Sequence, residues 1–336
     1  MICMQRNKII VAIIVAISLI IGISWRNSYI SEKMNPGLAI RQLQKEGING
    51  SGVNIAIIDQ KLLTTHREYA HRLVHYEEVG DLNDEPVSMH GSVVSSILVG
   101  RKCGIASGAN LYYWAVAIRG NGTIGERYAQ AIYRVIEFNR TLPQKSRMRI
   151  ISISTGFDAK EGRTAFEAAI NQAQLDGIMV FTSTFPYYTT PVIAVYGAAL
   201  QMGGVRDNIN DYNVPPAVVT GWGQTAEVVV NERQQRGQQQ CYATIWVPIE
   251  PRLLASWRGN HRYEFYEEGG DSWATPYVAG VAALVLHVNP ALSNKQVIEI
   301  IAQTTVQNAH GLLMISPTNA IAHSGKQSGD EQSQLR

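Results

Sequence analysis

Short apolar runs alternate with longer amphipathic stretches along most of the chain. The apolar runs are rich in β-branched residues and predict buried strands at 53–58, 111–117, 150–154, 178–182 and 192–195. The longer stretches predict helices at 90–99, 126–139, 163–176, 272–287 and 293–304. Strands that alternate with helices imply βαβ units. We therefore expect an α/β fold of three layers, with a mostly parallel central sheet and helices on both faces.

The pattern predicts one domain from residue 38 to residue 324, without internal repeats. The polar, glutamine-rich segment 231–240 interrupts the alternation, and we expect it to form a surface loop. Residues 325–336 contain few apolar side chains, so they predict a disordered tail.

The N-terminus carries an apolar run at 9–25, preceded by Arg6 and Lys8. This pattern predicts a membrane anchor, with residues 1–8 as a basic cytoplasmic region and 26–37 as a stalk. A helix of this length rises about 25 Å, slightly less than a bilayer core. A cleaved signal peptide and a buried helix are the alternatives, but no small-residue cleavage site follows the run. The domain would lie outside the cytoplasm, and it would be secreted if the segment is cleaved.

The net charge and the cysteine spacing exclude some classes of binding partner. The net charge is +2, which gives no reason to expect nucleic acid. The spacing of Cys3, Cys103 and Cys241 does not match a zinc site, and we expect neither metal nor cofactor. Cys103 and Cys241 form either one disulfide or two buried free thiols.

Three polar residues stand at the ends of predicted elements. Asp59 follows an apolar strand, where a lone buried carboxylate is costly unless it faces a cleft or finds a partner. His90 begins a helix and is followed by Gly91, which permits close approach of another segment. Ser272 begins an apolar helix, where the helix dipole and free N–H groups favour a developing oxyanion. Taken singly, Asp59 and His90 are better explained as turn, capping or surface residues, and an ordinary N-cap explains Ser272 just as well.

The order Asp, His, Ser is the order found in subtilisin, and the local sequences resemble the subtilisin-like serine protease family. The match is most specific at Gly270–Gly280, which is similar to the family signature around its catalytic serine. The segments 52–59 and 90–94 are similar to the family's aspartate strand and histidine helix. The resemblance extends from about residue 38 to about residue 323.

The resemblance implies a serine endopeptidase of protein or peptide substrates, with Asp59, His90 and Ser272 as its triad. It also implies that Ser154, Thr155 and Gly156 pair with an extended substrate backbone. An active protease is one expectation. A pseudoprotease that binds peptides or a partner protein without cleavage is the alternative. An unrelated α/β hydrolase is disfavoured, because the chain lacks a G-x-S-x-G motif.

The sequence departs from the family at several positions. Gln60 replaces the small hydroxyl residue usual after the aspartate, and Asp271 replaces the threonine before the serine. The family's oxyanion-hole asparagine aligns near Pro186, which has no side-chain donor. Thr184, Tyr187 and Tyr188 are the candidate replacements, of which Thr184 is preferred. The loop that carries calcium in the family's histidine helix is missing, so we expect no calcium there.

Overall fold

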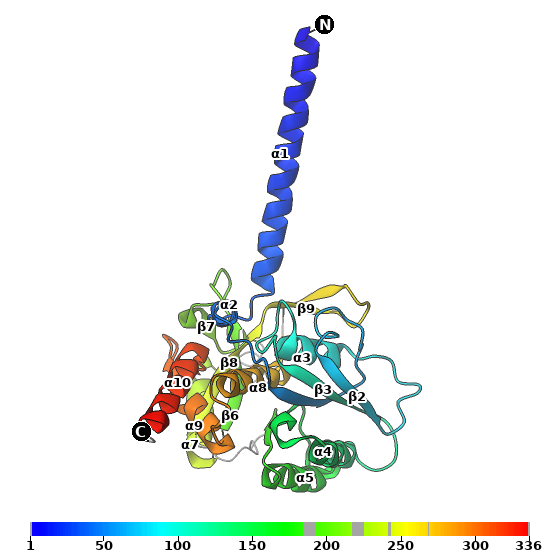
Figure 1. Cartoon of the computed structure of the whole chain (residues 1–336), viewed down its shortest axis with the longest axis vertical. Helices are drawn as coiled ribbons and strands as arrows, with labels where there is room; N and C mark the ends of the chain where they lie inside the picture. Colours follow the sequence, from blue (N-terminus) through cyan, green and yellow to red (C-terminus); the bar gives the residue numbers. More distant parts are fainter. Residues whose placement is uncertain (1, 184–192, 217–224, 241–242, 268, 335–336) are drawn as a thin grey trace.

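A computed structural model describes the chain except for residues 1, 184–192, 217–224, 241–242, 268 and 335–336 (Figure 1). The α-helices are α1 (Ile2–Lys33), α2 (Ile40–Lys45), α3 (Met89–Val99), α4 (Ile124–Thr141), α5 (Arg163–Leu175), α7 (Ala226–Gln240), α8 (Asp271–Val288), α9 (Asn294–Gln303) and α10 (Pro317–Gln334). The strands are β1 (Asn54–Asp59), β2 (Leu73–Val79), β3 (Asn110–Val116), β4 (Ile150–Ile153), β5 (Met179–Thr182), β6 (Ile193–Leu200), β7 (Tyr212–Asn213), β8 (Ala243–Glu250), β9 (Arg252–Ala255), β10 (Tyr263–Tyr266), β11 (Val306–Gln307) and β12 (Leu313–Met314).

The central sheet contains five parallel strands in the order β2-β3-β1-β4-β5. Every residue of β1 is buried, and its side chains alternate between two separate clusters. Ile55 and Ile57 point into the cluster that contains α3 and α8, whereas Ala56 and Ile58 point into the cluster that contains α4 and α5. This period of two is the geometry of a strand that is covered on both faces.

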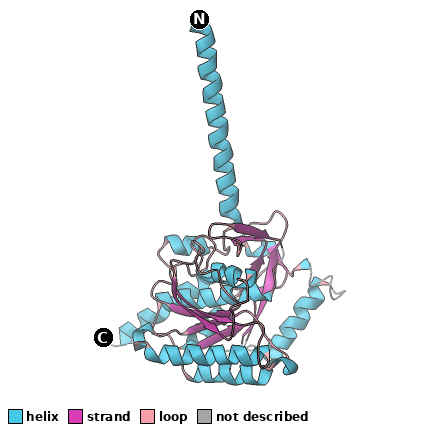
Figure 2. Cartoon of the chain, turned by 90° about the vertical axis from the view of Figure 1, so that its right-hand side faces the viewer, coloured by secondary structure: helices cyan, strands magenta, loops and turns pink. Residues whose placement is uncertain are grey.

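Helices α4 and α5 lie side by side under one face of this sheet (Figure 1). On the other face, the long apolar helix α8 packs against α3, β4 and β5. Helix α8 also contacts β6 and β8 of a second five-stranded sheet, ordered β11-β12-β8-β6-β7. Strands β9 and β10 form a separate hairpin. The α/β fold with a parallel sheet between helical layers is therefore confirmed (Figure 2).

The structure differs from the sequence prediction in polar segments and in the buried apolar strand β8, which was not predicted. The expected loop at 231–240 lies within helix α7, and helix α10 continues through the expected tail to Gln334. Polarity alone does not distinguish a solvent-facing helix from a loop, because residues such as Gln and Glu have good helix propensity. Strand β2 was not predicted. Its residues are mostly half-buried, as expected of a strand at the edge of the sheet.

Helix α1 projects away from the domain in Figures 1 and 2. It continues through most of the predicted stalk, to Lys33. Within the part of the chain that is described, no helix combines the length and the apolar character needed to cross a membrane. The membrane anchor predicted at 9–25 is therefore not supported. The extracytoplasmic location stays a prediction.

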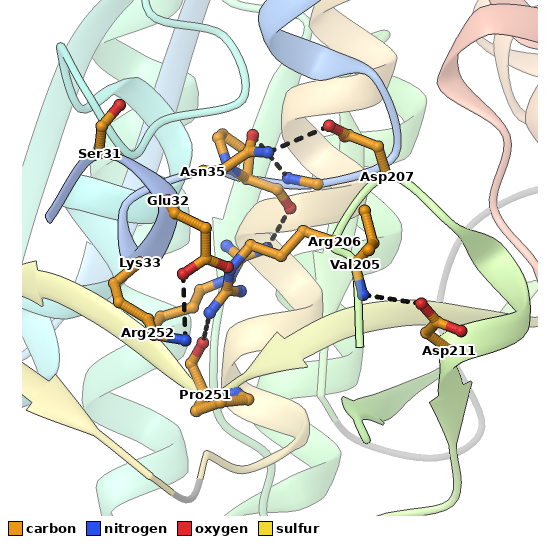
Figure 3. A network of polar contacts seen from close by, with 12 residues as sticks. Ser31, Glu32, Lys33, Asn35, Val205, Arg206, Asp207, Asp211, Pro251 and Arg252 are labelled. Carbon is orange, nitrogen blue, oxygen red and sulfur yellow. Dashed lines mark hydrogen bonds and ion pairs between the residues drawn. The ribbon is translucent and has the colours of Figure 1, made fainter. Parts of the chain in front are cut away.

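Polar contacts attach the end of α1 to the domain (Figure 3). Arg206 is buried, and its guanidinium contacts Glu32 at 3.2 Å and donates to the carbonyl of Pro251. Asp207 accepts from the side chain of Asn35 at 3.2 Å and from the backbone of Ala39 at 2.7 Å. These contacts fix the segment that connects α1 to α2.

Candidate active site

Asp59 is the last residue of β1, and its side chain lies on the same side of the sheet as Ile55 and Ile57. That is the side covered by α3. Only 1% of Asp59 is exposed. Its Oδ1 atom accepts a hydrogen bond from the backbone N–H of Gln60 at 2.7 Å. The strand alternation therefore directs a buried carboxylate toward the start of α3.

His90 lies in the first turn of α3, and its imidazole meets this carboxylate. The distances from His90 Nδ1 to Oδ1 and Oδ2 of Asp59 are 2.8 and 3.0 Å. Because a carboxylate only accepts hydrogen bonds, Nδ1 carries the proton and Nε2 is the free ring nitrogen when the imidazole is neutral. The negative charge of Asp59 raises the pKa of His90 above its ordinary value, although burial of the ring opposes this effect.

Gly91 allows the loop after β1 to lie directly against α3. A Cβ atom at this position would be 2.5 Å from the Tyr113 hydroxyl and 2.9 Å from the carbonyl oxygen of Gln60. Tyr113 is fully buried, and its hydroxyl donates to that same carbonyl at 2.5 Å. A glycine after the histidine is therefore required by close packing beside the Asp59–His90 pair.

Ser272 is the second residue of α8, whose first turn is also closely packed. A Cβ atom on Gly269 would collide with the ring of Trp273. The carboxylate of Asp271 accepts from the buried backbone N–H of Gly197 at 2.9 Å, which ties this helix start to β6. Among the described residues, no hydrogen bond joins Ser272 to His90, although the helices that carry them pack against each other.

The other predicted residues lie in different environments. Ser154 is buried, Thr155 is half-buried and Gly156 is exposed, so this segment passes from the end of β4 to the surface. Thr184 and Cys241 lie outside the described residues. Cys103 is a buried free thiol, which agrees with the free-thiol alternative for this residue. No group of metal-ligating side chains occurs in the described segments.

Sequence reasoning gave no role to three residues around the Asp59–His90 pair, one of which it noted only as a departure from the family. These residues are Gln60, Ser88 and Tyr113. Ser88 is the N-cap of α3 and accepts a hydrogen bond from the backbone N–H of His90 at 3.0 Å. A serine two positions before the histidine was a usable capping signal. No sequence signal indicated that Tyr113 would reach the same place from β3.

Comparison with known proteins gives a consistent family match. The family model described as the subtilase family matches residues 50–185 and 252–332, which together exceed half of the chain. A thermostable alkaline protease from Halalkalibacterium halodurans is 27% identical over 300 residues, covering 85% of this chain and 70% of that protein. Subtilisin BL from Lederbergia lenta is 24% identical, covering 75% of this chain and 82% of that protein. Alkaline elastase YaB from a Bacillus species is 26% identical, but the chain spans only 59% of it.

Solved structures resemble the fold at low sequence identity. The prenylagaramide maturation protease PagA has a TM-score of 0.55 and 20% identity, and the match covers 85% of this chain and 98% of that one. A protease from Pseudoalteromonas arctica has a TM-score of 0.58 and 15% identity, covering 88% of this chain and 96% of that one. These likenesses concern the arrangement of the backbone.

Proposed function

Because the chain belongs to the subtilase family, we propose that it is a serine endopeptidase with Asp59, His90 and Ser272 as its catalytic triad. The observation that carries the proposal is the 2.8 Å contact between His90 Nδ1 and the buried carboxylate of Asp59. This contact selects the tautomer in which Nε2 can accept a proton. The raised pKa of His90 also makes it a stronger base.

The proposed reaction follows from these positions. As Ser272 Oγ forms a bond to the carbonyl carbon of a peptide, its proton moves to His90 Nε2. Asp59 stabilises the imidazolium. His90 then gives the proton to the leaving amine nitrogen, and the peptide C–N bond breaks to leave an acyl-enzyme. Water activated by His90 hydrolyses the ester and regenerates Ser272.

Helix α8 offers electrostatic support for this chemistry. Ser272 lies in its first turn, where backbone N–H groups have no partner within the helix and the dipole favours negative charge. We propose that the N–H of Ser272 donates to the oxyanion. The second donor, which the sequence predicts at Thr184, stays a prediction.

Substrate binding is proposed along the segment after β4. Ser154, Thr155 and Gly156 pass from buried to exposed, so their backbone can offer donors and acceptors to an extended peptide. Recognition of this kind adds a strand to the protein and uses main-chain hydrogen bonds. The substrate is therefore a protein or peptide segment in extended conformation.

The test compares the purified full chain with its Ser272→Ala variant on a fluorogenic casein substrate and with a fluorophosphonate probe. We expect the unaltered chain to cleave casein and to be labelled at Ser272, and the variant to do neither. Circular dichroism establishes that both are folded. Casein cleavage that is the same in the variant would refute the assignment of Ser272.

The second candidate function is peptide binding without cleavage. It is favoured by one observation: among the described residues, Ser272 Oγ does not hydrogen-bond His90. A binding-only protein would retain peptides in a pull-down or anisotropy assay. It would not react with the fluorophosphonate, so labelling at Ser272 separates the two functions.

A further inference from the structure

A closed circuit of hydrogen bonds connects Asp59 and His90 by a second route. The Oδ1 atom of Asp59 accepts from His90 Nδ1 at 2.8 Å and from the backbone N–H of Gln60 at 2.7 Å. The side chain of Gln60 extends the circuit, because its Oε1 accepts from the hydroxyl of Ser88 at 2.5 Å. That hydroxyl accepts from the backbone N–H of His90 at 3.0 Å.

We propose that Gln60 and Ser88 are positioning residues that hold His90 against Asp59. This inference rests on the proposed triad and deepens it. Neither residue is assigned a contact with substrate. Their role is to fix the backbone of His90, while Asp59 holds its ring. The backbone N–H and the imidazole of His90 are then both held, and together they fix the distance between Nδ1 and the carboxylate.

The chemistry of the Ser88 hydroxyl explains why Gln60 is needed. A hydroxyl has a single proton to donate, and its lone pairs accept. While the proton is donated to Gln60 Oε1, a lone pair faces the N–H of His90. Without an acceptor at position 60, the hydroxyl can rotate and direct its proton elsewhere, which weakens the cap of α3. Gln60 therefore sets the orientation of the group that anchors His90.

Backbone contacts hold the same loop in place. The N–H of Ser88 donates to the carbonyl of Lys61 at 2.7 Å, and Tyr113 donates to the carbonyl of Gln60. The backbone beside Gly91 packs against the same carbonyl. These contacts fix the position of the loop. The hydrogen bond between the Gln60 and Ser88 side chains also fixes the orientation of the hydroxyl that caps α3 at His90. A long amide side chain therefore suits position 60, because it can reach this hydroxyl.

The experiment uses the full chain with Gln60→Met, which keeps length but removes the acceptor, and Gln60→Glu, which restores the acceptor. We expect Gln60→Met to lower kcat roughly 5- to 10-fold, the effect of one ordinary hydrogen bond, with KM changed less than twofold. Gln60→Glu should recover most of kcat. Ser88→Ala should resemble Gln60→Met, and the double variant should be no slower than either single variant, because one circuit is broken in each.

A matched control exists at the start of α9. Ser293 caps that helix, and its hydroxyl lies 2.8 Å from Gln296 Oε1, so this pair repeats the same chemistry outside the circuit. Gln296→Met and Ser293→Ala should lower the melting temperature but leave kcat unchanged. If these controls lose as much kcat as Gln60→Met, the loss in Gln60→Met is explained by general destabilisation. That result would overturn the proposal.

A second measurement does not depend on turnover. The His90 Nδ1 proton should be visible in proton NMR as a hydrogen-bonded imidazole signal, and its exchange with water should be several-fold faster in folded Gln60→Met than in the unaltered chain. An unchanged exchange rate, or a kcat within twofold of the unaltered chain, refutes the positioning role. Failure of Ser272 to react with fluorophosphonate refutes the proposed triad instead. The failure of the positioning role and the failure of the triad therefore give different results.

Discussion

Substitution of Gly91 by alanine tests whether close packing holds His90 at Asp59. The backbone of Gly91 does not adopt a left-handed conformation, so alanine is tolerated by the backbone itself. Its Cβ would nevertheless lie 2.5 Å from the hydroxyl of Tyr113. Ordinary van der Waals contact begins at 3.4 Å, so the two segments must separate by about 0.9 Å. Neither segment can move easily, because the tyrosine is fully buried and bonded to the Gln60 carbonyl.

The magnitude follows from that displacement. Overpacking of this kind costs about 1–3 kcal/mol of folding free energy, and in a domain of this size each kcal/mol lowers Tm by about 2–4 °C. The effect on catalysis should be larger than on stability. A catalytic group moved by nearly 1 Å can lose about 100-fold in rate. We therefore expect Gly91→Ala to remain folded with a Tm lower by several degrees, and kcat/KM to fall by about two orders of magnitude.

The assay combines thermal melts with hydrolysis of a fluorogenic peptide. Gly325→Ala is the control, because Gly325 is an exposed residue of α10 and a Cβ there meets nothing within 4 Å. Adding Tyr113→Phe to Gly91→Ala removes the closest contact and should restore part of the lost activity. The reasoning is refuted if Gly91→Ala is as active as the unaltered chain. It is also refuted if the losses in kcat/KM of Gly91→Ala and Tyr113→Phe simply multiply in the double variant.

Three further predictions concern titration, the start of α8 and the buried thiol. His90 has a pKa above its ordinary 6.5, so kcat/KM should rise with pH through that raised pKa, and Asp59→Asn should move the midpoint lower. By the same linkage, the pair stabilises the fold fully below about pH 6.5, and urea titrations should show this contribution fading as pH rises through the raised pKa. Asp271→Ala leaves the buried N–H of Gly197 without its acceptor and should cost about 1–3 kcal/mol in chemical denaturation, whereas Asp271→Asn should retain most of the stability. Burial raises the pKa of the Cys103 thiol well above its ordinary value. In a variant whose other two cysteines are replaced by serine, Cys103 should therefore react with Ellman's reagent only after unfolding. Rapid reaction in the native state would contradict this.

Local signals in the sequence were sufficient for several of the elements that face the core, although the buried strand β8 was missed. The apolar run before Asp59 became β1, and the helix predicted from Ser272 to His287 became α8, because burial on all sides requires continuous apolar residues. Prediction also failed in polar segments. Helix α7 and the end of α10 have little apolar periodicity, and the apolar run near the N-terminus looked more like a membrane span than the structure supports.

The sequence by itself determined the α/β fold and the three candidate residues, because strand periodicity, helix starts and a family signature are all local patterns. It also placed Asp59 at a strand end and His90 at a helix start. Only the tertiary structure decided that Gln60, Ser88 and Tyr113 surround this pair. These residues come from β3 and from two loops, and they meet through hydrogen bonds and a close approach at Gly91. Contacts of this kind depend on the three-dimensional distance between elements, which no periodicity along the chain encodes.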